Sequence, residues 1–449
     1  MANQLILVAA FFSMFGVGLS WAAPFRVEEG VLNQDNVDLG LVYAPKAQTV
    51  TIFAPTPQSD HYGNGAVMTG FKGKLYCQWQ SSATDEDAAD TWVAYSVATI
   101  GQNEDGSPVE TWSDPMELAP TLQEGIRTSG GWRVFEDTLI AFINVWPAGM
   151  EPKGGFAFYR ESVDGIHWGE LKPVLMKDGS SMEGIVEQDP HEYDGRLYNA
   201  AHFQPGLLAS PIFTDDLSGR SGWVKPSYTN LEHSGTSSRE MEPSLFKNSD
   251  GNLVMTFRDQ NSTYFRLASV SEDQGATWSL AELTNMPDSR AKQSAGNLPD
   301  GSVYLVGNPV TNKTRIPLSI TLSDDGKVFD RAYNLRTESE LPERIYDGLY
   351  KSVGYHYPKT TIYGDYLYIS YSTNKERIEY TRIPLAEICE YMPETRQNEE
   401  SEWKESLQKR VVKEHLIKSD GDGMIYDANG RSHRNKRSFY VLRSLLKRL

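Results

Sequence analysis

Six short apolar segments recur along the chain, and each follows a turn rich in Gly, Asp or other polar residues. They read KGKLYCQW, EDTLIAFI, DGRLYNAA, DGNLVMTF, DGSVYLVG and GDYLYISY. Short runs of alternating apolar and polar positions, bounded by turn residues, are typical of β-strands. No convincing helical pattern separates these segments. The pattern therefore predicts a chain of short strands joined by tight turns.

A second motif, the Asp box, recurs with a similar spacing. It has the order Ser, Asp, Gly and then an aromatic residue, in SVDGIHW (162–168), SVSEDQGATWS (269–279) and SDDGKVF (323–329), with looser copies in 96–112 and in TDDLSGRSGW (214–223). Ser and Asp can bind the backbone of a hairpin turn, and Gly can adopt the positive φ that such a turn needs. The aromatic residue can then pack between sheets. We therefore expect a structural motif that carries no catalysis.

The spacing of these motifs predicts the architecture. Their starts lie near residues 96, 162, 214, 271 and 323, and a fixed period of about 50–65 residues indicates a solenoid, a propeller or an array. Repeats of several short strands without helices favour four-stranded propeller blades. We predict an all-β, six-bladed propeller over residues 23–392. An N-terminal strand should complete the last blade, because ring closure removes exposed sheet edges.

The two ends of the chain differ from this pattern. Residues 5–19 form an apolar run that is followed by SWAAP, so we expect a signal peptide over 1–22, cleavage near Ala22 or Ala23, and a secreted or periplasmic protein. Residues 393–449 are charged, with a helix-compatible stretch and a basic, partly apolar end. We expect a solvated or surface-packed helical extension, the alternative being an amphipathic helix that binds a membrane or a partner.

Composition limits the partners and cofactors. The chain has 449 residues, 37 Gly, 23 Pro and a formal charge of −17, which suits a turn-rich β protein and argues against nucleic-acid binding. Its two cysteines, Cys77 and Cys389, are far apart, and no cysteine–histidine cluster suggests a metal site. We expect a monomer without metal or cofactor, with membrane contact only through the C-terminal extension.

A six-bladed propeller with Asp boxes resembles the sialidase (neuraminidase) superfamily. The resemblance covers most of residues 60–387. It implies a tyrosine nucleophile with a glutamate base, an aspartate general acid/base, and three arginines that bind the substrate carboxylate. An anionic sugar would repel a carboxylate nucleophile, which explains the neutral tyrosine. Planar guanidinium groups match a carboxylate with two parallel hydrogen bonds.

Several segments of the chain resemble the catalytic motifs of that family. MEPSLFKNSDGNLVMTFRDQ places Glu242 as the base and Arg258 as a clamp residue. RIPLSITLSDDG supplies Arg315. In GYHYPKTTIYGDYLYISY the nucleophile position falls on Tyr357, with Tyr355 as the near alternative. SSATDEDAADTWVAYS resembles the acid/base loop, where the candidates are Asp85, the best fit, then Asp87 and Asp90.

The chain departs from the family pattern at the first arginine. That residue belongs just before the inner strand of the first blade, but no arginine lies between Arg26 and Arg127. The arginine triad is therefore incomplete in the sequence. Arg290 or Lys292, in PDSRAKQSAGNLPDG, can supply the third cation, and His61 is a further candidate.

These motifs predict a secreted, exo-acting retaining glycosidase that acts on terminal sialic acid or a related acidic sugar. Two histidines, His191 and His202, flank one strand in EQDPHEYDGRLYNAAHFQPG, either as structural residues or as substrate contacts. Together with a tyrosine and arginines, they leave open a polysaccharide lyase that removes a proton beside a uronate carboxylate. A different glycosidase on a uronate-containing glycan and a non-catalytic glycan-binding propeller also remain open.

Overall fold

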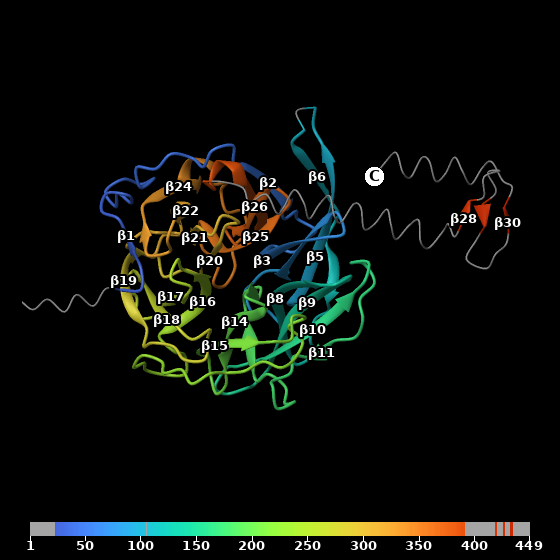
Figure 1. Cartoon of the computed structure of the whole chain (residues 1–449), viewed down its shortest axis with the longest axis horizontal. Helices are drawn as coiled ribbons and strands as arrows, with labels where there is room; N and C mark the ends of the chain where they lie inside the picture. The colour runs from blue at the N-terminus through green and yellow to red at the C-terminus, as the bar shows by residue number, and fades with distance from the viewer. Residues whose placement is uncertain (1–22, 105, 391–417, 420–424, 427–431, 434–449) are drawn as a thin grey trace, which may run out of the picture. The chain divides into compact units, whose positions relative to one another are not determined.

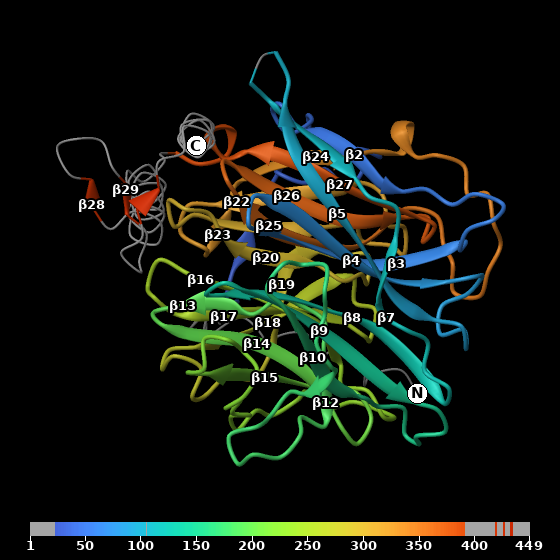
Figure 2. The same ribbon diagram turned by 90° about the vertical axis from the view of Figure 1, so that its right-hand side faces the viewer.

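The computed structural model describes residues 23–104, 106–390, 418–419, 425–426 and 432–433. The chain divides into two compact units, Met1–Cys389 and Glu390–Leu449. In the first unit, six sheets follow one another around a central axis, from the blue β3 to the orange β26 (Figures 1 and 2). This arrangement confirms the predicted all-β, six-bladed propeller.

The first three blades use residues up to 214 and run outward from an inner strand. Blade 1 consists of β3 (Tyr62–Phe71), β4 (Lys74–Ser82), β5 (Trp92–Gln102) and β6 (Pro108–Trp112), with β7 (Met116–Ala119) also paired to β5. Blade 2 consists of β8 (Gly125–Phe135), β9 (Thr138–Pro147), β10 (Phe156–Ser162) and β11 (Lys172–Pro173). Blade 3 consists of β12 (Gly184–Val186), β14 (Arg196–Phe203) and β15 (Leu208–Thr214), with the short β13 (His191–Tyr193) also paired to β14.

The last three blades repeat the same antiparallel order. Blade 4 consists of β16 (Glu240–Lys247), β17 (Leu253–Asp259), β18 (Phe265–Ser271) and β19 (Glu282–Pro287). Blade 5 consists of β20 (Ser294–Asn297), β21 (Val303–Gly307), β22 (Leu318–Ser323) and β24 (Arg331–Arg336). Blade 6 consists of β25 (Tyr355–Tyr363), β26 (Tyr366–Thr373), β27 (Arg377–Pro384) and β2 (Gln48–Phe53).

Strand β2 closes the ring, as predicted. It comes from the N-terminal part of the chain and pairs antiparallel with β27, so that Thr49 lies opposite Thr381 and their hydroxyl groups are 2.8 Å apart. In Figure 1 the blue β2 accordingly lies among the orange strands of blade 6. A second N-terminal strand, β1 (Arg26–Val27), pairs in parallel with β23 (Val328–Phe329). N-terminal residues thus complete blade 6 and pair with β23, which lies between β22 and β24 of blade 5 in the sequence.

Buried apolar side chains lie between neighbouring blades and fix their order. Val67 of blade 1 packs with Trp132 of blade 2, for example, in a cluster that also contains Tyr76 and Leu139. Trp79 of blade 1 belongs to a cluster with tyrosines of blade 6. Among the described residues of the propeller, the helical elements are the 3₁₀ turns η1 (Glu338–Glu340) and η2 (Leu385–Glu387). The core is therefore a series of sheet-to-sheet contacts around the axis.

The three well-formed Asp boxes make the hydrogen bonds expected of them. In the box at 323–329, the hydroxyl of Ser323 donates to Asp325 (3.0 Å) and accepts from the amide of Gly326 (2.9 Å). The Asp325 carboxylate also accepts from the amides of Lys327 (2.7 Å) and Val328 (3.0 Å). Trp168 and Trp278 of the other two boxes pack against the inter-blade clusters. The motif therefore stabilises a hairpin, as expected from the sequence.

Replacing Asp325 by alanine should lower stability without changing the central site. Loss of its backbone hydrogen bonds should cost about 1–2 kcal/mol. Burial opposes ionisation, but the bonds from Val328 and Lys327 outweigh it and lower the pKa of Asp325. The contribution is therefore present above the unfolded pKa of about 3.9 and is lost as acid protonates the folded carboxylate. Urea unfolding between pH 3 and 7 measures this effect. The neighbouring Asp324→Ala is the control, and equal destabilisation by both variants would contradict the prediction.

The C-terminal unit is described only in part. Its described residues form three short antiparallel strands, β28 (Lys418–Ser419), β29 (Ile425–Tyr426) and β30 (Ser432–His433). The remainder of the predicted helical extension, like the predicted signal peptide, lies outside the described residues. Within the described residues, no helix combines the length and the apolar character needed to cross a membrane.

Candidate active site

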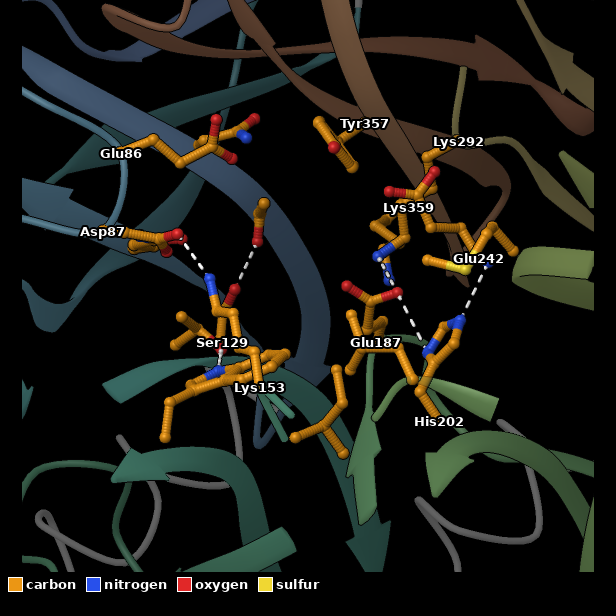
Figure 3. Close-up of a pocket in the computed structure, with 18 residues that line it drawn as sticks. Glu86, Asp87, Ser129, Lys153, Glu187, His202, Glu242, Lys292, Tyr357 and Lys359 are labelled. Atoms are coloured by element: carbon orange, nitrogen blue, oxygen red, sulfur yellow. Dashed lines mark hydrogen bonds and ion pairs between the residues drawn. The ribbon is translucent and has the colours of Figure 1, made fainter. Parts of the chain in front are cut away.

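A pocket of about 220 Å³ lies where the inner strands of the blades converge (Figure 3). Polar and titratable residues from five blades and from the segment that leads into blade 5 line it. They are Glu86, Asp87, Lys153, Glu187, His202, Glu242, Lys292, Tyr357 and Lys359. Trp146, Ile185, Leu207 and Met241 add an apolar part. A concave site that combines apolar surface with converging polar groups is the form expected of a ligand-binding site.

The inner strands that reach this pocket are interrupted by β-bulges. The pairing register shifts between Asn64 and Val67 in β3, and between Ser129 and Gly131 in β8. It shifts again between Met241 and Ser244 in β16, and between His356 and Lys359 in β25. A bulge bends the strand and redirects a side chain. The pocket is thus lined partly by residues that the regular pleat would not direct there.

Tyr357 is one of these redirected residues. Its φ of 55° lies in the left-handed region that a bulky residue rarely adopts. Three cations lie near its ring, with the ring centre 5.2 Å from the Arg315 guanidinium carbon, 5.4 Å from Lys292 Nζ and 5.7 Å from Lys375 Nζ. Burial and the charge of Glu242 nevertheless raise the pKa of Tyr357. The phenol is therefore protonated at neutral pH and needs a base to become a nucleophile.

Glu242 is the second redirected residue. Its φ is 50°, and its side chain is 7% exposed. Its Oε2 lies 2.8 Å from Nη1 of Arg258, and its backbone amide donates to Nε2 of His202 (3.1 Å). That bond makes Nε2 an acceptor and leaves the proton of neutral His202 on Nδ1, 3.6 Å from Glu187. A left-handed backbone conformation at a non-glycine residue costs about 1–3 kcal/mol of folding free energy, and such residues are concentrated at functional sites.

The arginines lie in an adjoining depression of about 410 Å³. It is lined by Arg258, Ser289, Arg290, Lys313, Arg315 and Ser352. Arg258 links this depression to the pocket through its ion pair with Glu242, and Arg315 links it through its contact with Tyr357. Nη1 of Arg315 donates to Nδ1 of His356 (3.0 Å). The structure therefore brings Arg290 together with the two arginines that the sequence analysis places in the clamp.

Arg290 is held in an unusual conformation in this depression. It has a φ of 57°, and its Nε is buried without a hydrogen-bond partner among the described residues. An unsatisfied buried donor is costly unless a water or a ligand completes it. The remaining candidate cations lie elsewhere. Lys292 lines the 220 Å³ pocket instead, and the His61 ring stacks on Tyr346 at 3.7 Å and lines neither cavity.

The acidic loop between β4 and β5 brings Glu86 and Asp87 to the pocket. Oε2 of Glu86 pairs with Nζ of Lys375 at 2.5 Å, and Oδ2 of Asp87 pairs with Nζ of Lys153 at 2.5 Å. The remaining two aspartates of the loop bind backbone. Asp85 accepts from the amide of Leu349, and Asp90 accepts from the amide of Ala83 (3.0 Å). Asp85, the best fit by sequence, does not line the pocket, whereas the second candidate, Asp87, does.

The two histidines of blade 3 are separated from one another. His202 is buried on β14 and lines the pocket. His191, on β13, lies opposite Tyr198 and lines neither cavity. Burial and the charge of Lys359 lower its pKa to about 4. The structure therefore gives no paired histidine site, among the residues it describes, of the kind that a lyase would use.

Tyr355, the second candidate nucleophile, lies outside the pocket. Its hydroxyl donates to the carbonyl of Thr337 (2.8 Å), and its ring packs edge-to-face on Tyr371. It is fully buried in blade 6. The geometry therefore leaves Tyr357 as the tyrosine of this pair that a ligand can reach.

Comparison with known proteins agrees with the geometry. The sequence profile of the BNR repeat-like domain matches residues 73–369, which is well over half of the chain. The chain belongs to the BNR repeat-like domain family. A search of curated protein sequences gave no match. The solved structures described next are similar in fold to this BNR propeller.

One structure, named "Sialidase", is 18% identical, has a TM-score of 0.55 and covers 80% of this chain. The BNR propeller corresponds to 35% of the length of that protein. The Hadza microbial sialidase Hz136 is 16% identical, with a TM-score of 0.54 and coverage of 76% of this chain and 69% of that one. A protein of unknown function from Dyadobacter fermentans DSM 18053 is 13% identical, with a TM-score of 0.55 and coverage of 75% and 99%. At these identities the comparison establishes a sialidase-like fold.

Several residues of the site were not identified from the sequence. They are Glu86, Lys153, Glu187, Lys359 and Lys375. A charged residue within an inner strand, such as Lys359 in YHYPKTTIY, is the one available sequence signal. Charged side chains are rarely fully buried unless they are paired, so a lysine at such a position indicates a specific partner. The remaining four lie in loops or at strand ends, where the hydrophobic pattern gives no orientation.

Proposed function

We propose that the BNR propeller is an exo-acting retaining glycosidase for a terminal acidic sugar, with sialic acid as the first substrate to test. The observation that carries the proposal is the arrangement of Tyr357 and Glu242. Both project from bulged inner strands at left-handed positions. Both line one pocket, and arginines line the depression beside it. A tyrosine with a carboxylate partner beside an anion-binding surface suits attack on an anionic sugar.

The arginine depression is assigned to the carboxylate of the sugar. Arg258, Arg290 and Arg315 present guanidinium groups that can donate pairs of hydrogen bonds to it. The contact between Arg315 and Tyr357 then sets the anomeric carbon near the phenol oxygen. Holding the reactants in this way reduces the entropic cost of the reaction.

The substrate carboxylate should also release the base. In the structure Glu242 is bound to Arg258 through Oε2 and Nη1, so part of its negative charge is neutralised. A substrate carboxylate that binds Arg258 competes for the same guanidinium group. Glu242 then becomes free to accept the proton of Tyr357. Binding and activation of the nucleophile are thereby coupled through one arginine.

The chemical steps follow from these positions. The oxygen of Tyr357 attacks the anomeric carbon while its proton passes to Glu242, and the bond to the leaving oxygen breaks. We assign the proton that the leaving group receives to Asp87 rather than Asp85, because Asp87 lines the pocket and Asp85 binds the amide of Leu349. Asp87 enters this step protonated, so its ion pair with Lys153 must open when the substrate binds. Water then attacks the anomeric carbon and gives a proton to Asp87, while the bond between that carbon and the Tyr357 oxygen breaks. Glu242 returns the first proton to the Tyr357 oxygen. The anomeric configuration is retained after two displacements.

A product assay with the purified protein tests the proposed reaction class. Sialosides, glycosides of other keto-acid sugars and uronate polysaccharides are each incubated with the protein, and products are followed by mass spectrometry and absorbance. Release of a sugar with addition of one water supports the proposal. An unsaturated uronate product would indicate a lyase, and binding without turnover would indicate a glycan-binding module. Either result would contradict the proposed hydrolase.

A further inference from the structure

Lys359 lacks the partners that a buried lysine normally has. It lies on β25, and the residue is 3% exposed. Its Nζ has no hydrogen-bond acceptor among the described residues, although a lysine side chain has protons to donate. The side chain lines the 220 Å³ pocket beside Glu187 (Figure 3). Such a group needs a specific explanation, such as a ligand that completes its bonding.

Another buried lysine of the same propeller shows what a structural role looks like. Nζ of Lys351 lies 2.9 Å from Oε1 of Glu376 and 2.9 Å from the carbonyl oxygen of His61. Its side chain is 0% exposed, so its charge is compensated by protein groups. Lys359 has no such pair of acceptors among the described residues. The difference indicates that Nζ of Lys359 is available to bind a ligand in the pocket, rather than being held by protein groups within blade 6.

Lys292 is a second weakly paired lysine beside Lys359. Its side chain is 4% exposed, and it forms an ion pair with Oε2 of Glu187 at 3.5 Å. That separation is longer than the roughly 2.7–2.9 Å of a good charge-assisted hydrogen bond. Glu187 also lies 3.6 Å from Nδ1 of His202, and its Oε2 forms no hydrogen bond to described residues. The Glu187 carboxylate therefore makes only loose contacts with Lys292 and His202, and it lines the same pocket as Lys359.

The other nearby titratable groups, Asp189 and His202, add little charge to this wall of the pocket. Asp189 is buried, its carboxylate accepts from the amide of Trp132 (2.5 Å), and burial raises its pKa to about 7. It is therefore partly protonated at neutral pH. Burial lowers the pKa of His202, so that this ring is neutral. Lys292 and Lys359 thus place two lysine Nζ groups on one wall of the pocket, and Lys359 becomes charged when an anion binds beside it.

We propose that Lys292 and Lys359 form a subsite for a second anionic group of the substrate: a carboxylate, a sulfate ester or a phosphate ester. The subsite is distinct from the arginine depression, because the lysines line the pocket and Arg290 and Arg315 line the depression. The Tyr357 ring lies near both, at 5.4 Å from Lys292 and 5.2 Å from Arg315. The preferred substrate is then a doubly charged acidic sugar. This inference rests on the proposed function.

Anion binding at this subsite should be linked to proton uptake. Burial, followed by the charge of Lys292, lowers the pKa of Lys359 well below its ordinary value. An anion beside Nζ would raise that pKa, so the amine takes up a proton as the anion binds, and affinity should increase as the pH falls. The charged and titratable groups that face Lys359 are Lys292, Glu187, Asp189, His191 and His202.

Calorimetric titration of the full-length protein with inorganic sulfate and inorganic phosphate tests the subsite. Lys359→Met should weaken sulfate binding at least about tenfold, and Lys292→Met should weaken it similarly, because each removes an Nζ group that donates to the bound anion. Lys172→Met removes an exposed lysine that pairs with Glu161 and is the control. In wild-type protein, titrations in two buffers of different ionisation enthalpy should show proton uptake.

Two outcomes would overturn the inference. One is unchanged sulfate affinity in the folded Lys359→Met variant. The other is sulfate binding that is lost in Arg290→Ala but retained in Lys359→Met, which would place the anion in the arginine depression. If Lys359→Met does not fold, Lys292→Met and the proton-uptake measurement decide the question. The proposed hydrolase fails separately, through absence of turnover on every acidic glycoside, while sulfate binding persists.

Discussion

Tyr357→Phe should reduce turnover of an acidic glycoside by at least about a thousandfold, because removal of a covalent nucleophile leaves only binding and charge stabilisation. Substrate affinity should change little, because the arginines remain in place. The measurement is kcat with a chromogenic sialoside, or with whichever acidic glycoside proves active. Thermal stability should be kept, since phenylalanine retains the ring that lies beside Arg315 and Lys292.

Tyr355→Phe is the matched control for that experiment. It removes the same hydroxyl group two residues away, where the hydroxyl donates to the carbonyl of Thr337. This variant should lose roughly 1 kcal/mol of stability and keep its turnover. A Tyr357→Phe enzyme that stays within about tenfold of wild-type kcat, or a larger loss of kcat in Tyr355→Phe, would exclude Tyr357 as the nucleophile.

Arg290→Ala should raise the KM for an acidic substrate about tenfold to a hundredfold. A hydrogen bond between charged groups contributes about 1.5–3 kcal/mol, and each 1.4 kcal/mol corresponds to a factor of about ten. Arg258→Ala should weaken binding by a similar factor and should also change kcat, because its loss leaves Glu242 without its ion-pair partner. Stability should change little in Arg290→Ala, since the guanidinium Nε has no partner among the described residues.

Lys313→Ala is the control for the clamp, because Lys313 also lines the arginine depression but lacks a planar guanidinium group. It should change the KM less than Arg290→Ala does. Full activity of Arg290→Ala on an acidic substrate would show that Arg290 is not the third cation. Activity on neutral sugars alone would show that this propeller does not use its arginines to bind a carboxylate.

The propeller itself was predictable from the sequence because its signals are repeated. Strand segments and Asp boxes recur with a period close to one blade, and each box sets a turn through its own side chains. A degenerate copy of a motif can still be recognised, because the well-formed copies define the spacing at which it should occur. The closing strand β2 carries no such repeat, but ring closure requires a partner for the outer edge of blade 6.

The orientation of individual side chains in the site was harder to predict. A regular strand would direct Tyr355, Tyr357 and Lys359 to the same face, yet Tyr355 is buried in blade 6 while the latter two line the pocket. The bulge between His356 and Lys359 causes this difference in orientation. No local sequence pattern predicts the position of that bulge.

In the acidic loop between β4 and β5, the sequence could not show which aspartate reaches the pocket. Its candidates Asp85, Asp87 and Asp90 have similar chemistry, and a loop has no period from which to infer direction. The left-handed backbone at Asp87, with a φ of 64°, and its ion pair with Lys153 bring that residue to the pocket. Lys153 comes from blade 2 and is far away in sequence. Only the folded arrangement of two blades can therefore distinguish among the three aspartates.

The left-handed backbone conformation of Glu242 and Tyr357 has a consequence for protein engineering. Glycine relieves the backbone strain at a position of positive φ, where a side chain with a Cβ is unfavourable. The two residues most closely tied to the proposed chemistry are therefore also places where the native side chain carries backbone strain. A campaign that selects variants only for heat resistance does not protect either residue, and a glycine that relieves the strain would remove a proposed catalytic group. Libraries built on this scaffold should hold both codons fixed.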